Sequence, residues 1–376
     1  MTSRPSWETF EVRQDELLKP YTTFKIGGPA RYFANIRSLE ELTPALDFAR
    51  TRQLPIFVIG GGSNILVSDR GFPGLVLHPV QEGLTLVGEE GSTAALRCSA
   101  AEVWDRVVAY TVEHGWWGIE NLSHIPGQAG AALVQNIGAY GQQLSDVLVN
   151  AEVADLKTAE LRAFTAEECQ LGYRKSIFNT TAKGRFFIFS ITLALAKSYR
   201  PNLRYADVQN YFSSRSTTRP AQREIREAII AIRDRKFPFP REEKGGNAGS
   251  FFKNLTVSSM EFARLENHVR RNFGPEVLAR LQGTVRRAAG ADEINVPTAL
   301  LMDICGLKGF EIGRARVNAT QPLVLLNEGG ATADDVLRLA KHVRQTIYQQ
   351  TGMSISIEPE LVGFTEAERS DYLALE

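Results

Sequence analysis

The chain has 376 residues, of which 43% are hydrophobic, so it is long enough for two or three domains that each bury a core. Its 43 lysines and arginines balance 43 aspartates and glutamates, which predicts no net attraction to nucleic acid or to an anionic membrane. The three cysteines and five histidines lack metal-binding spacing, and no apolar run approaches the roughly 20 residues of a membrane span, so we expect a soluble cytoplasmic protein without a metal.

The N-terminal half is predicted to alternate helices with strands. Surface helices are expected over residues 38–52 and 99–114, because each opens with a serine followed three residues later by a glutamate, the pattern of a capping box. The β-branched runs at 56–59 and 75–77 predict short strands between these helices. Residues 148–196 favour strands, interrupted by a short helix near 165–170.

Residues 198–222 show no periodicity and predict a long loop, which is uncommon in a compact domain unless it is functional. A helix is predicted from about residue 221 to 236, where the sequence FPFP ends it because proline cannot continue a helix. We expect a domain boundary there. The C-terminal half is predicted to be a separate α/β unit, with helices over 261–272, 297–305 and 333–350 and strands over 323–326 and 354–364.

Two glycine-rich runs are candidate ligand contacts. The run VIGGGSNILV, at 58–67, is a strand that enters a glycine turn, and backbone amides in such a turn can hold a diphosphate. It lacks the GK[ST] of a P-loop and the third glycine of GxGxxG, so a tight structural turn is an equally good interpretation. The run at 121–141 has small residues that let the backbone approach a flat ring, with Tyr140 within reach, although a domain crossing of small residues is the alternative.

Three basic residues are candidates for binding anions. Arg174, in the short polar loop GYRKSIF, can grip a carboxylate with two hydrogen bonds and stabilise developing negative charge, or it can be a solvated surface residue. Arg233 and Lys236 are three residues apart and share one face of the predicted helix. They can bind phosphate, or they can simply offset the dipole at the helix C-terminus.

Ser250 and Glu360 are candidates for proton chemistry. Ser250 lies in GGNAGSFFKN, where the preceding glycines allow a backbone path that points the hydroxyl into a cavity. No GxSxG motif and no neighbouring histidine accompany it, so we interpret it as a proton donor rather than a nucleophile, or else as a serine that bonds its own turn. Glu358 and Glu360 share one side of the last predicted strand, where a carboxyl can relay a proton or remain solvated.

From about residue 21 to 364, seven motifs occur in an order that resembles the UDP-N-acetylenolpyruvoylglucosamine reductase (MurB) family: YTTFKIGGPA, VIGGGSNILV, GIENLSHIPGQAGAALVQNIGAYG, GYRKSIF, GNAGSFFKN, CGLKGFEIG and EPE. The resemblance implies an α+β fold. Its FAD-binding domain is of the vanillyl-alcohol-oxidase type, has two α+β subdomains and precedes a C-terminal α/β substrate-binding domain. The implied limits are an N-terminal extension at 1–20, the FAD-binding domain at 21–198, a substrate-closing loop and connecting helix at 199–240, and the C-terminal domain at 241–376.

The resemblance also implies a reaction. NADPH reduces non-covalently bound FAD, and the reduced flavin delivers hydride to the enolpyruvyl group of UDP-N-acetylglucosamine enolpyruvate, which gives UDP-N-acetylmuramate for peptidoglycan synthesis. Arg174 and Glu360 match the family residues that stabilise the resulting charge, with Glu360 protonated or acting through water. Ser250 matches the residue that protonates the intermediate. We expect a monomer whose partners are this substrate and NADPH.

Further contacts follow from the same matching. The residues that match flavin contacts are Tyr21, Gly60, Gly61, Gly62, Ser63, Asn64, Ile65, Ile125, Pro126, Gly127, Gly130 and Asn136. The residues that match substrate or nicotinamide nucleotide contacts are Tyr140, Tyr205, Arg233, Lys236, Asn254 and Gln321. Tyr205 matches the tyrosine with which one subclass closes over the UDP group, but the chain beyond it is longer than the family pattern. Val362 stands where we expect a basic residue.

Two other functions remain open. One is an oxidase of the same flavin fold with another substrate. Such oxidases often tether FAD through histidine or cysteine, and here only His124 lies near a glycine-rich run. The other is a catalytically silent protein that binds flavin or a UDP-sugar, which the joint presence of Arg174, Ser250 and Glu360 disfavours.

Overall fold

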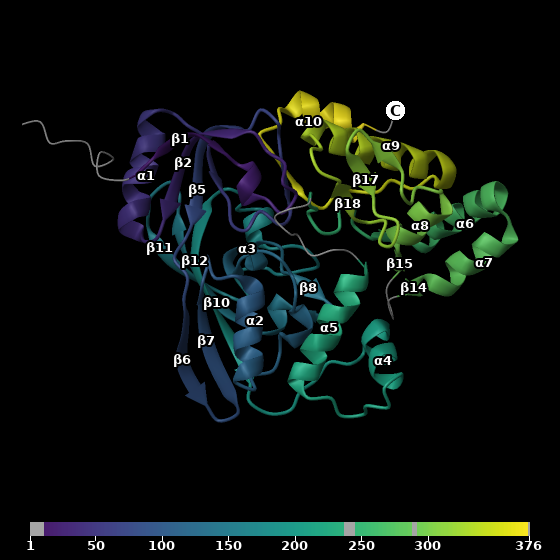
Figure 1. Ribbon diagram of the computed structural model, residues 1–376, viewed down its shortest axis with the longest axis horizontal. Coiled ribbons are helices and arrows are strands. Elements are labelled where there is room, and N and C mark those ends of the chain that lie inside the picture. Colours follow the sequence, from purple (N-terminus) through teal and green to yellow (C-terminus); the bar gives the residue numbers. More distant parts are fainter. Residues whose placement is uncertain (1–10, 237–244, 288–291, 375–376) are drawn as a thin grey trace, which may run out of the picture. The chain divides into compact units, whose positions relative to one another are not determined.

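The computed structural model describes residues 11–236, 245–287 and 292–374, which are drawn in colour in Figure 1. The chain divides into two compact units. Of the described residues, unit one comprises 11–16, 30–62 and 72–236, and unit two comprises 17–29, 63–71 and those from 245 onward. Unit two is therefore built from three separate segments of the chain, two of them short. The four domain ranges expected from the sequence have other limits than these two units, and they remain predictions.

The first sheet of unit one has the strand order β1-β2-β5-β3. Strand β5 pairs in parallel with both β2 and β3, and the core between this sheet and helix α1 contains Leu42, Phe48, Leu75 and Leu77. The predicted alternation of helix and strand is confirmed here. The bounds are β1 Arg13–Leu17, β2 Pro29–Ile36, α1 Leu39–Thr51, β3 Ile56–Val58 and β5 Phe72–Pro79.

The second sheet of unit one is antiparallel throughout and has the order β11-β10-β12-β7-β6. Helix α3 packs on β7 and β12, and α2 lies against α3, with Trp104 only 1% exposed in the core. The strands predicted within residues 148–196 are confirmed as β10, β11 and β12. The bounds are β6 Leu84–Glu90, β7 Thr93–Ser99, α2 Trp104–Glu113, α3 Ala129–Val134, β10 Leu148–Asp155, β11 Leu161–Thr165 and β12 Phe186–Ala196.

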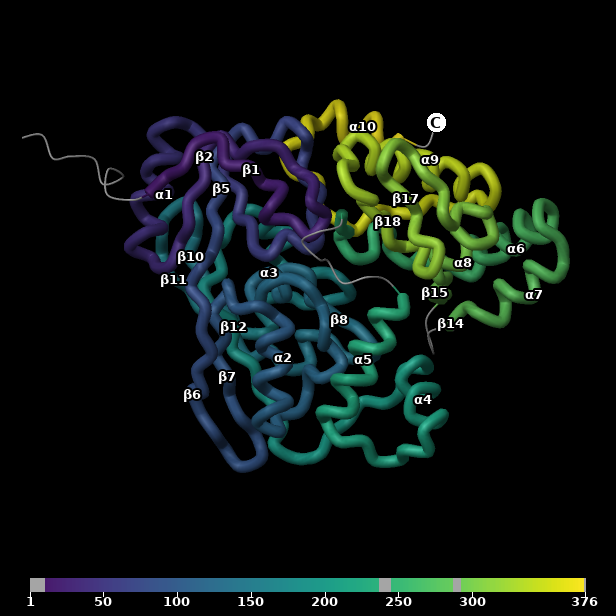
Figure 2. Tube along the Cα trace, viewed as in Figure 1, coloured from purple at the N-terminus to yellow at the C-terminus, as the bar shows by residue number. Residues whose placement is uncertain are grey.

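Unit one ends in two helices that pack together, α4 (Ala206–Ser213) and α5 (Gln222–Lys236), both visible along the chain trace in Figure 2. The prediction of an unbroken loop over residues 198–222 is wrong over α4. Val208 and Phe212, four residues apart, lie on one helical face and are buried with Ile225 and Ile229 of α5. The burial of this short apolar face supplies the stability that the local sequence does not indicate.

Unit two contains three small sheets, of order β13-β15-β14, β16-β17-β18 and β19-β4, covered by helices. All three C-terminal helices predicted from the sequence are present as α6, α8 and α9, and α10 packs on α9. The bounds are β4 Ile65–Val67, β13 Leu255–Val257, α6 Ser259–Phe273, α7 Pro275–Thr284, β14 Arg286–Arg287, β15 Ile294–Val296, α8 Thr298–Ile304, β16 Glu311–Ile312, β17 Ala315–Val317, β18 Leu325–Asn327, α9 Ala333–Thr351, β19 Glu360–Val362 and α10 Glu366–Leu373.

The capping boxes predicted for the first two helices are wrong. Ser38 precedes α1 but makes no capping hydrogen bond, and the Glu41 carboxylate instead accepts from the backbone N–H of Arg37. Helix α2 begins five residues after the predicted serine, and Glu102 accepts from the backbone N–H of Gly83. In both places the glutamate carboxylate accepts a hydrogen bond from a backbone N–H that does not belong to the predicted capping box.

Two further predictions of secondary structure need correction. Residues 166–170 form turns rather than a helix, although Thr165 and Glu168 exchange hydrogen bonds of the capping type. The final strand is shorter than residues 354–364. Pro359 has no N–H to donate, so only an isolated bridge at Ile357 precedes β19.

Candidate functional site

The two glycine-rich runs meet within unit one. The turn that follows β3 lies so close to the second run that a Cβ added to Gly61 would be 2.7 Å from the Cα of Gly127 and 3.2 Å from the backbone nitrogen of Gln128. Gly130 likewise packs against Ala100, at 2.8 Å from a built Cβ to the alanine Cβ. The backbone of the turn therefore lies directly against the backbone of the second run. A ligand bound here would meet main-chain amides rather than side chains.

Gln128 adds a polar group to this cradle. Its Oε1 atom is buried and lacks a hydrogen-bond partner within the described part of the chain, and it lies 3.2 Å from the position of a Cβ on Gly60. A buried acceptor without a partner costs about 1–3 kcal/mol. FAD carries donors in its adenine amine and its ribose and ribityl hydroxyls, so the residues present fit this cofactor. Gln128 was not among the predicted flavin contacts. It is the one polar side chain among the small residues of PGQAGAA, and this isolation is what could have indicated it.

The other predicted flavin contacts of unit one flank this cradle. Ile125 and Pro126 are half-buried directly before Gly127. The Asn136 amide donates to the carbonyl of Gly172 at 2.9 Å, and its oxygen accepts from the backbone N–H of Ser145 at 2.9 Å. The Asn136 side chain therefore ties two loops together. Tyr21, Ser63, Asn64 and Ile65 belong to unit two.

A second cluster in unit one contains cations and aromatic rings. The Nζ of Lys236 lies 2.6 Å from Oδ2 of Asp207 and 5.5 Å from the ring centroid of Tyr140. The Tyr140 and Tyr205 rings meet edge to face, with centroids 5.2 Å apart. Arg233 donates through Nε to the carbonyl of His124 at 2.8 Å. The structure thus brings together four of the six predicted substrate contacts.

The electrostatics of this cluster keep both cations charged. Burial favours the neutral amine of Lys236, but the Asp207 hydrogen bond and the nearby Tyr140 outweigh it, so the pKa of Lys236 is raised. Burial lowers the pKa of Arg233, which nevertheless stays protonated because a guanidinium cannot be deprotonated in proteins. Burial also raises the pKa of Tyr140, against the opposing effect of the two cations. The cluster therefore contains two cations, one of them paired with the Asp207 carboxylate, and a neutral phenol, all of them groups that can donate to phosphate oxygens.

Arg174 completes the polar lining of unit one. Its backbone is left-handed, with φ at 53°, and its Nη2 atom donates to the carbonyl of Gly138 at 2.7 Å in strand β8 (Gly138–Ala139). Burial is the largest effect that lowers the pKa of Arg233, and nearby acidic groups oppose it. The positive charge of Arg174 adds a smaller lowering effect. The guanidinium is therefore held at the strand that leads to Tyr140.

The backbone at Tyr140 is itself held by a buried network. Tyr140 has a φ of 48°, which is unusual for a large side chain. The Asn121 amide donates to the carbonyls of Tyr140 and Asn202, both at 2.8 Å, and the Asn202 amide donates to the carbonyl of Gly141 at 2.7 Å. These contacts retain a conformation that would otherwise be unfavourable.

In unit two, Ser250 is held on both sides of its backbone. Ser250 forms an isolated bridge with Val324, and the next residue, Phe251, accepts from the backbone N–H of Glu358 at 2.8 Å. Phe252 pairs with Ile357 in antiparallel fashion. The same register puts Ser250 opposite Pro359, one residue from Glu360. Phe251 and Phe252 are fully buried and anchor this segment.

Glu360 joins the serine segment to the end of the glycine turn. Its backbone N–H donates to the carbonyl of Asn64 at 3.0 Å, and β19 pairs in parallel with β4 so that Glu360 lies beside Ile65. The Asn64 amide also donates to the carbonyl of Glu358 at 3.4 Å. Within unit two, the two predicted proton-handling residues therefore lie close to the residues that follow the glycine turn.

The remaining predicted residues have structural contacts. The side-chain oxygen Oδ1 of Asn254 accepts from the backbone N–H of Thr298 at 3.2 Å, at the start of α8. Gln321 accepts through its backbone carbonyl from Val324, the bridge partner of Ser250, at 2.9 Å. Val362 is 3% exposed in β19, so this position is part of the core.

No group of three histidine, cysteine, aspartate or glutamate side chains in the described part of the chain could hold a metal ion. None of the helices described is long and apolar enough to span a membrane. Cys98, Cys169 and Cys305 are free.

Comparisons with known proteins cover both units. Residues 30–164 match the family model described as FAD binding domain, and residues 240–362 match UDP-N-acetylenolpyruvoylglucosamine reductase, C-terminal domain. The UDP-N-acetylenolpyruvoylglucosamine reductase of Pseudomonas putida is 38% identical over 355 residues, which is 94% of this chain and 99% of the relative. That of Burkholderia multivorans is 38% identical over 361 residues, or 96% and 99%. The crystal structure of the Thermus caldophilus enzyme covers 94% of this chain and 98% of its own, with a TM-score of 0.61 at 24% identity. The predicted α+β fold, an FAD-binding domain followed by a C-terminal domain of this reductase family, is confirmed.

Proposed function

Because the chain belongs to the UDP-N-acetylenolpyruvoylglucosamine reductase family, which consists of FAD oxidoreductases of peptidoglycan synthesis, we propose that it reduces UDP-N-acetylglucosamine enolpyruvate to UDP-N-acetylmuramate with NADPH. Bound FAD would supply the hydride-transfer chemistry between NADPH and the substrate. The observation that carries the proposal is in unit two. Ser250 lies two residues before Phe252, which bridges to Ile357 just ahead of Glu360, and Glu360 pairs with Ile65 shortly after the glycine turn.

The flavin is held without a covalent bond, by Gln128 and the backbone around Gly61 and Gly127. The nearest candidate for a covalent link is His124, and its ring nitrogen Nε2 already lies 3.0 Å from a carboxylate oxygen of Asp234. Denatured protein should therefore release its flavin, and flavin that stays with the chain would contradict this point.

Arg233, Lys236 and Tyr140 bind the diphosphate of the UDP-sugar and, in turn, the phosphates of NADPH. Two cations beside a neutral phenol give charge-assisted hydrogen bonds to phosphate oxygens. Tyr205 lies against Tyr140 and presents a second ring to the nucleotide. Gln321 and Asn254 contribute polar contacts in unit two.

Arg174, Glu360 and Ser250 act on the reacting carbons. Hydride adds to the terminal carbon of the enolpyruvyl double bond, and the π electrons move to the carbon that bears the carboxylate. The Arg174 guanidinium stabilises this negative charge, and Glu360 contributes in its protonated form or through a water. The Ser250 hydroxyl gives its proton to that carbon, and the serine oxygen then recovers a proton from solvent. Such a weak acid serves because the carbanion is strongly basic and the serine is fixed in place.

Two half-reactions test the proposal. Purified protein should be yellow, NADPH should bleach it, and adding the UDP substrate should sustain NADPH oxidation. Ser250→Ala should leave flavin reduction unchanged and slow overall turnover by about 10²- to 10⁴-fold, the usual contribution of a positioned acid. Ser354→Ala removes an exposed serine hydroxyl and is the matched control. Failure to take up FAD would end the proposal, and equal losses in both half-reactions would remove Ser250 from its role.

A further inference from the structure

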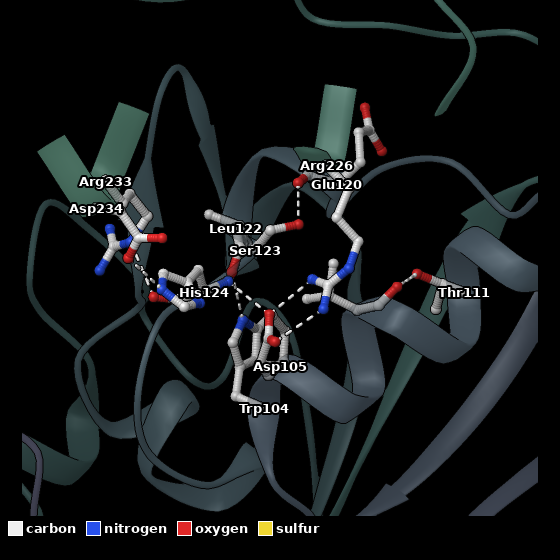
Figure 3. A network of polar contacts seen from close by, with 11 residues as sticks. Trp104, Asp105, Thr111, Glu120, Leu122, Ser123, His124, Arg226, Arg233 and Asp234 are labelled. Atoms are coloured by element: carbon white, nitrogen blue, oxygen red, sulfur yellow. Dashed lines mark hydrogen bonds and ion pairs between the residues drawn. The ribbon is translucent and has the colours of Figure 1, made fainter. Parts of the chain in front are cut away.

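A polar network in unit one links the flavin cradle to Arg233 (Figure 3). The start of α2 holds the loop 122–128 at three points. The backbone N–H of Trp104 donates to the carbonyl of Gly127 at 3.0 Å, the Trp104 indole donates to the carbonyl of Leu122 at 3.0 Å, and the backbone N–H of His124 donates to Asp105 at 2.5 Å. The loop that forms one wall of the flavin cradle is therefore anchored on α2.

Helix α5 is anchored to the same loop. Arg226 donates two hydrogen bonds to the two carboxylate oxygens of Asp105, at 2.7 and 2.8 Å. About two helical turns further along α5, Arg233 donates to the carbonyl of His124, and Asp234 faces the His124 ring. His124 is thus held at its N–H by α2 and at its carbonyl and ring by α5. Its backbone is left-handed, with φ at 60°, so this arrangement maintains an unfavourable conformation.

Asp105 is the residue on which these contacts converge. It accepts from α5 and from the loop at once, and both it and Arg226 are largely buried, with side chains 24% and 17% exposed. The pair is bidentate, which fixes orientation as well as distance. Arg233 lies two turns from Arg226 on the same helix, so the pair sets where α5 presents Arg233 relative to the loop.

We propose that Asp105 and Arg226 are positioning residues that set the place of Arg233 relative to the flavin-binding loop. This role rests on the proposed function, in which Arg233 binds the diphosphate of the UDP-sugar and of NADPH. Both act through Arg233 rather than on the ligand. Loss of Arg226 removes the bidentate contact between α5 and α2, whereas loss of Asp105 removes that contact and the hydrogen bond from the loop as well.

The alternative is an ion pair that only stabilises the fold, and the chain offers a matched control for it. Arg185 donates to Asp155 at 2.9 Å, and Asp155 also accepts a backbone N–H, from Lys157 at 2.8 Å. Asp155 is buried, as a paired carboxylate in the same unit, but it contacts neither α5 nor the loop. Arg185→Met therefore removes an arginine, 52% exposed, that pairs with a buried carboxylate, and it leaves Arg233 unchanged.

The experiment uses the FAD-loaded enzyme with NADPH and the UDP substrate. Arg226→Met should raise the KM for both nucleotides by about 10- to 100-fold, the scale expected when a binding group moves by about 1 Å, with FAD affinity unchanged. Asp105→Ala should raise both KM values and also weaken FAD binding. Arg185→Met should lower the melting temperature and leave KM and FAD affinity unchanged. If Arg226→Met does not fold, Arg226→Lys, which cannot form the bidentate contact, carries the same expectation.

A double variant separates positioning from stability. In the Arg233→Met background, adding Arg226→Met should change KM little, because the residue that it positions is already gone. Additive effects, or an unchanged KM in Arg226→Met, would overturn the positioning role while the wild type still turns over the substrate. A wild-type enzyme that fails to oxidise NADPH with this substrate would instead overturn the proposed function.

Discussion

Because Gly61 lies in close contact with Gly127, we expect Gly61→Ala to lower both the stability of the protein and its affinity for FAD. The new Cβ would lie 2.7 Å from the Cα of Gly127, 3.1 Å from its carbonyl carbon and 3.2 Å from the backbone nitrogen of Gln128. Carbon atoms pack best about 3.5–4.0 Å apart, so the overlap is about 1 Å. All three neighbours are backbone atoms, so the strain can be relieved only by moving the two glycine-rich runs apart.

The magnitude follows from two opposing effects. Overpacking costs about 1–3 kcal/mol, and alanine returns roughly 0.4–1 kcal/mol by restricting the unfolded chain, so values near the middle of both ranges leave a net loss of about 1–2 kcal/mol. At about 2–4 °C per kcal/mol, the melting temperature should fall by roughly 2–8 °C. If moving the two runs apart weakens the free energy of FAD binding by the same about 1–2 kcal/mol, the Kd for FAD should rise by about 5- to 30-fold.

The assay is FAD titration by fluorescence together with thermal unfolding. Gly88→Ala is the control, because a Cβ there would be 4.0 Å from the Ala95 Cβ, an ordinary contact. Gly60→Ala should be milder than Gly61→Ala, since its Cβ would meet side-chain atoms of Ala131 and Gln128 at 3.2 Å. A Gly61→Ala protein that melts and binds FAD like the Gly88→Ala protein would refute the reasoning.

Three other predictions concern single polar groups. Gln128→Met should raise the Kd for FAD by roughly 2- to 12-fold while leaving the flavin-free protein equally or more stable, and calorimetry showing weaker stability with unchanged affinity would contradict it. Burial acts to raise the pKa of Asp105, but Arg226 and the His124 N–H outweigh it and lower the pKa. The ionised Asp105 carboxylate therefore adds stability above its unfolded pKa of about 4, and this stability is lost as the pH falls through the lower folded pKa. Urea unfolding should accordingly show that the free energy of unfolding depends less on acid pH in Asp105→Asn than in the wild type. Equal pH slopes in the two proteins would count against this. Arg174→Lys should slow turnover by about 10²- to 10³-fold with flavin reduction by NADPH unchanged, whereas Lys175→Ala, at the exposed neighbouring position, should behave like the wild type in the same assays.

The predictions that failed show where local sequence is insufficient. Helix α4 was predicted as loop because its apolar positions are few, and only packing of Val208 and Phe212 on α5 makes it favourable. The serine and glutamate before α2 have the sequence of a capping box, yet Glu102 bonds Gly83, which the tertiary structure brings near. In each case a contact with a distant segment decided between local alternatives.

The ordered motifs were enough to identify the family and to single out the two glycine runs, Arg174, Ser250 and Glu360, because each motif shows which backbone freedom and which chemical group a position has. Packing of the folded chain was needed to show that Gly61 faces Gly127, that β19 lies beside β4, and that Asp105 pairs with Arg226, a residue 121 positions away. These contacts depend on which surfaces pack together once the chain has folded, and the spacing of residues along the chain carries no record of that choice.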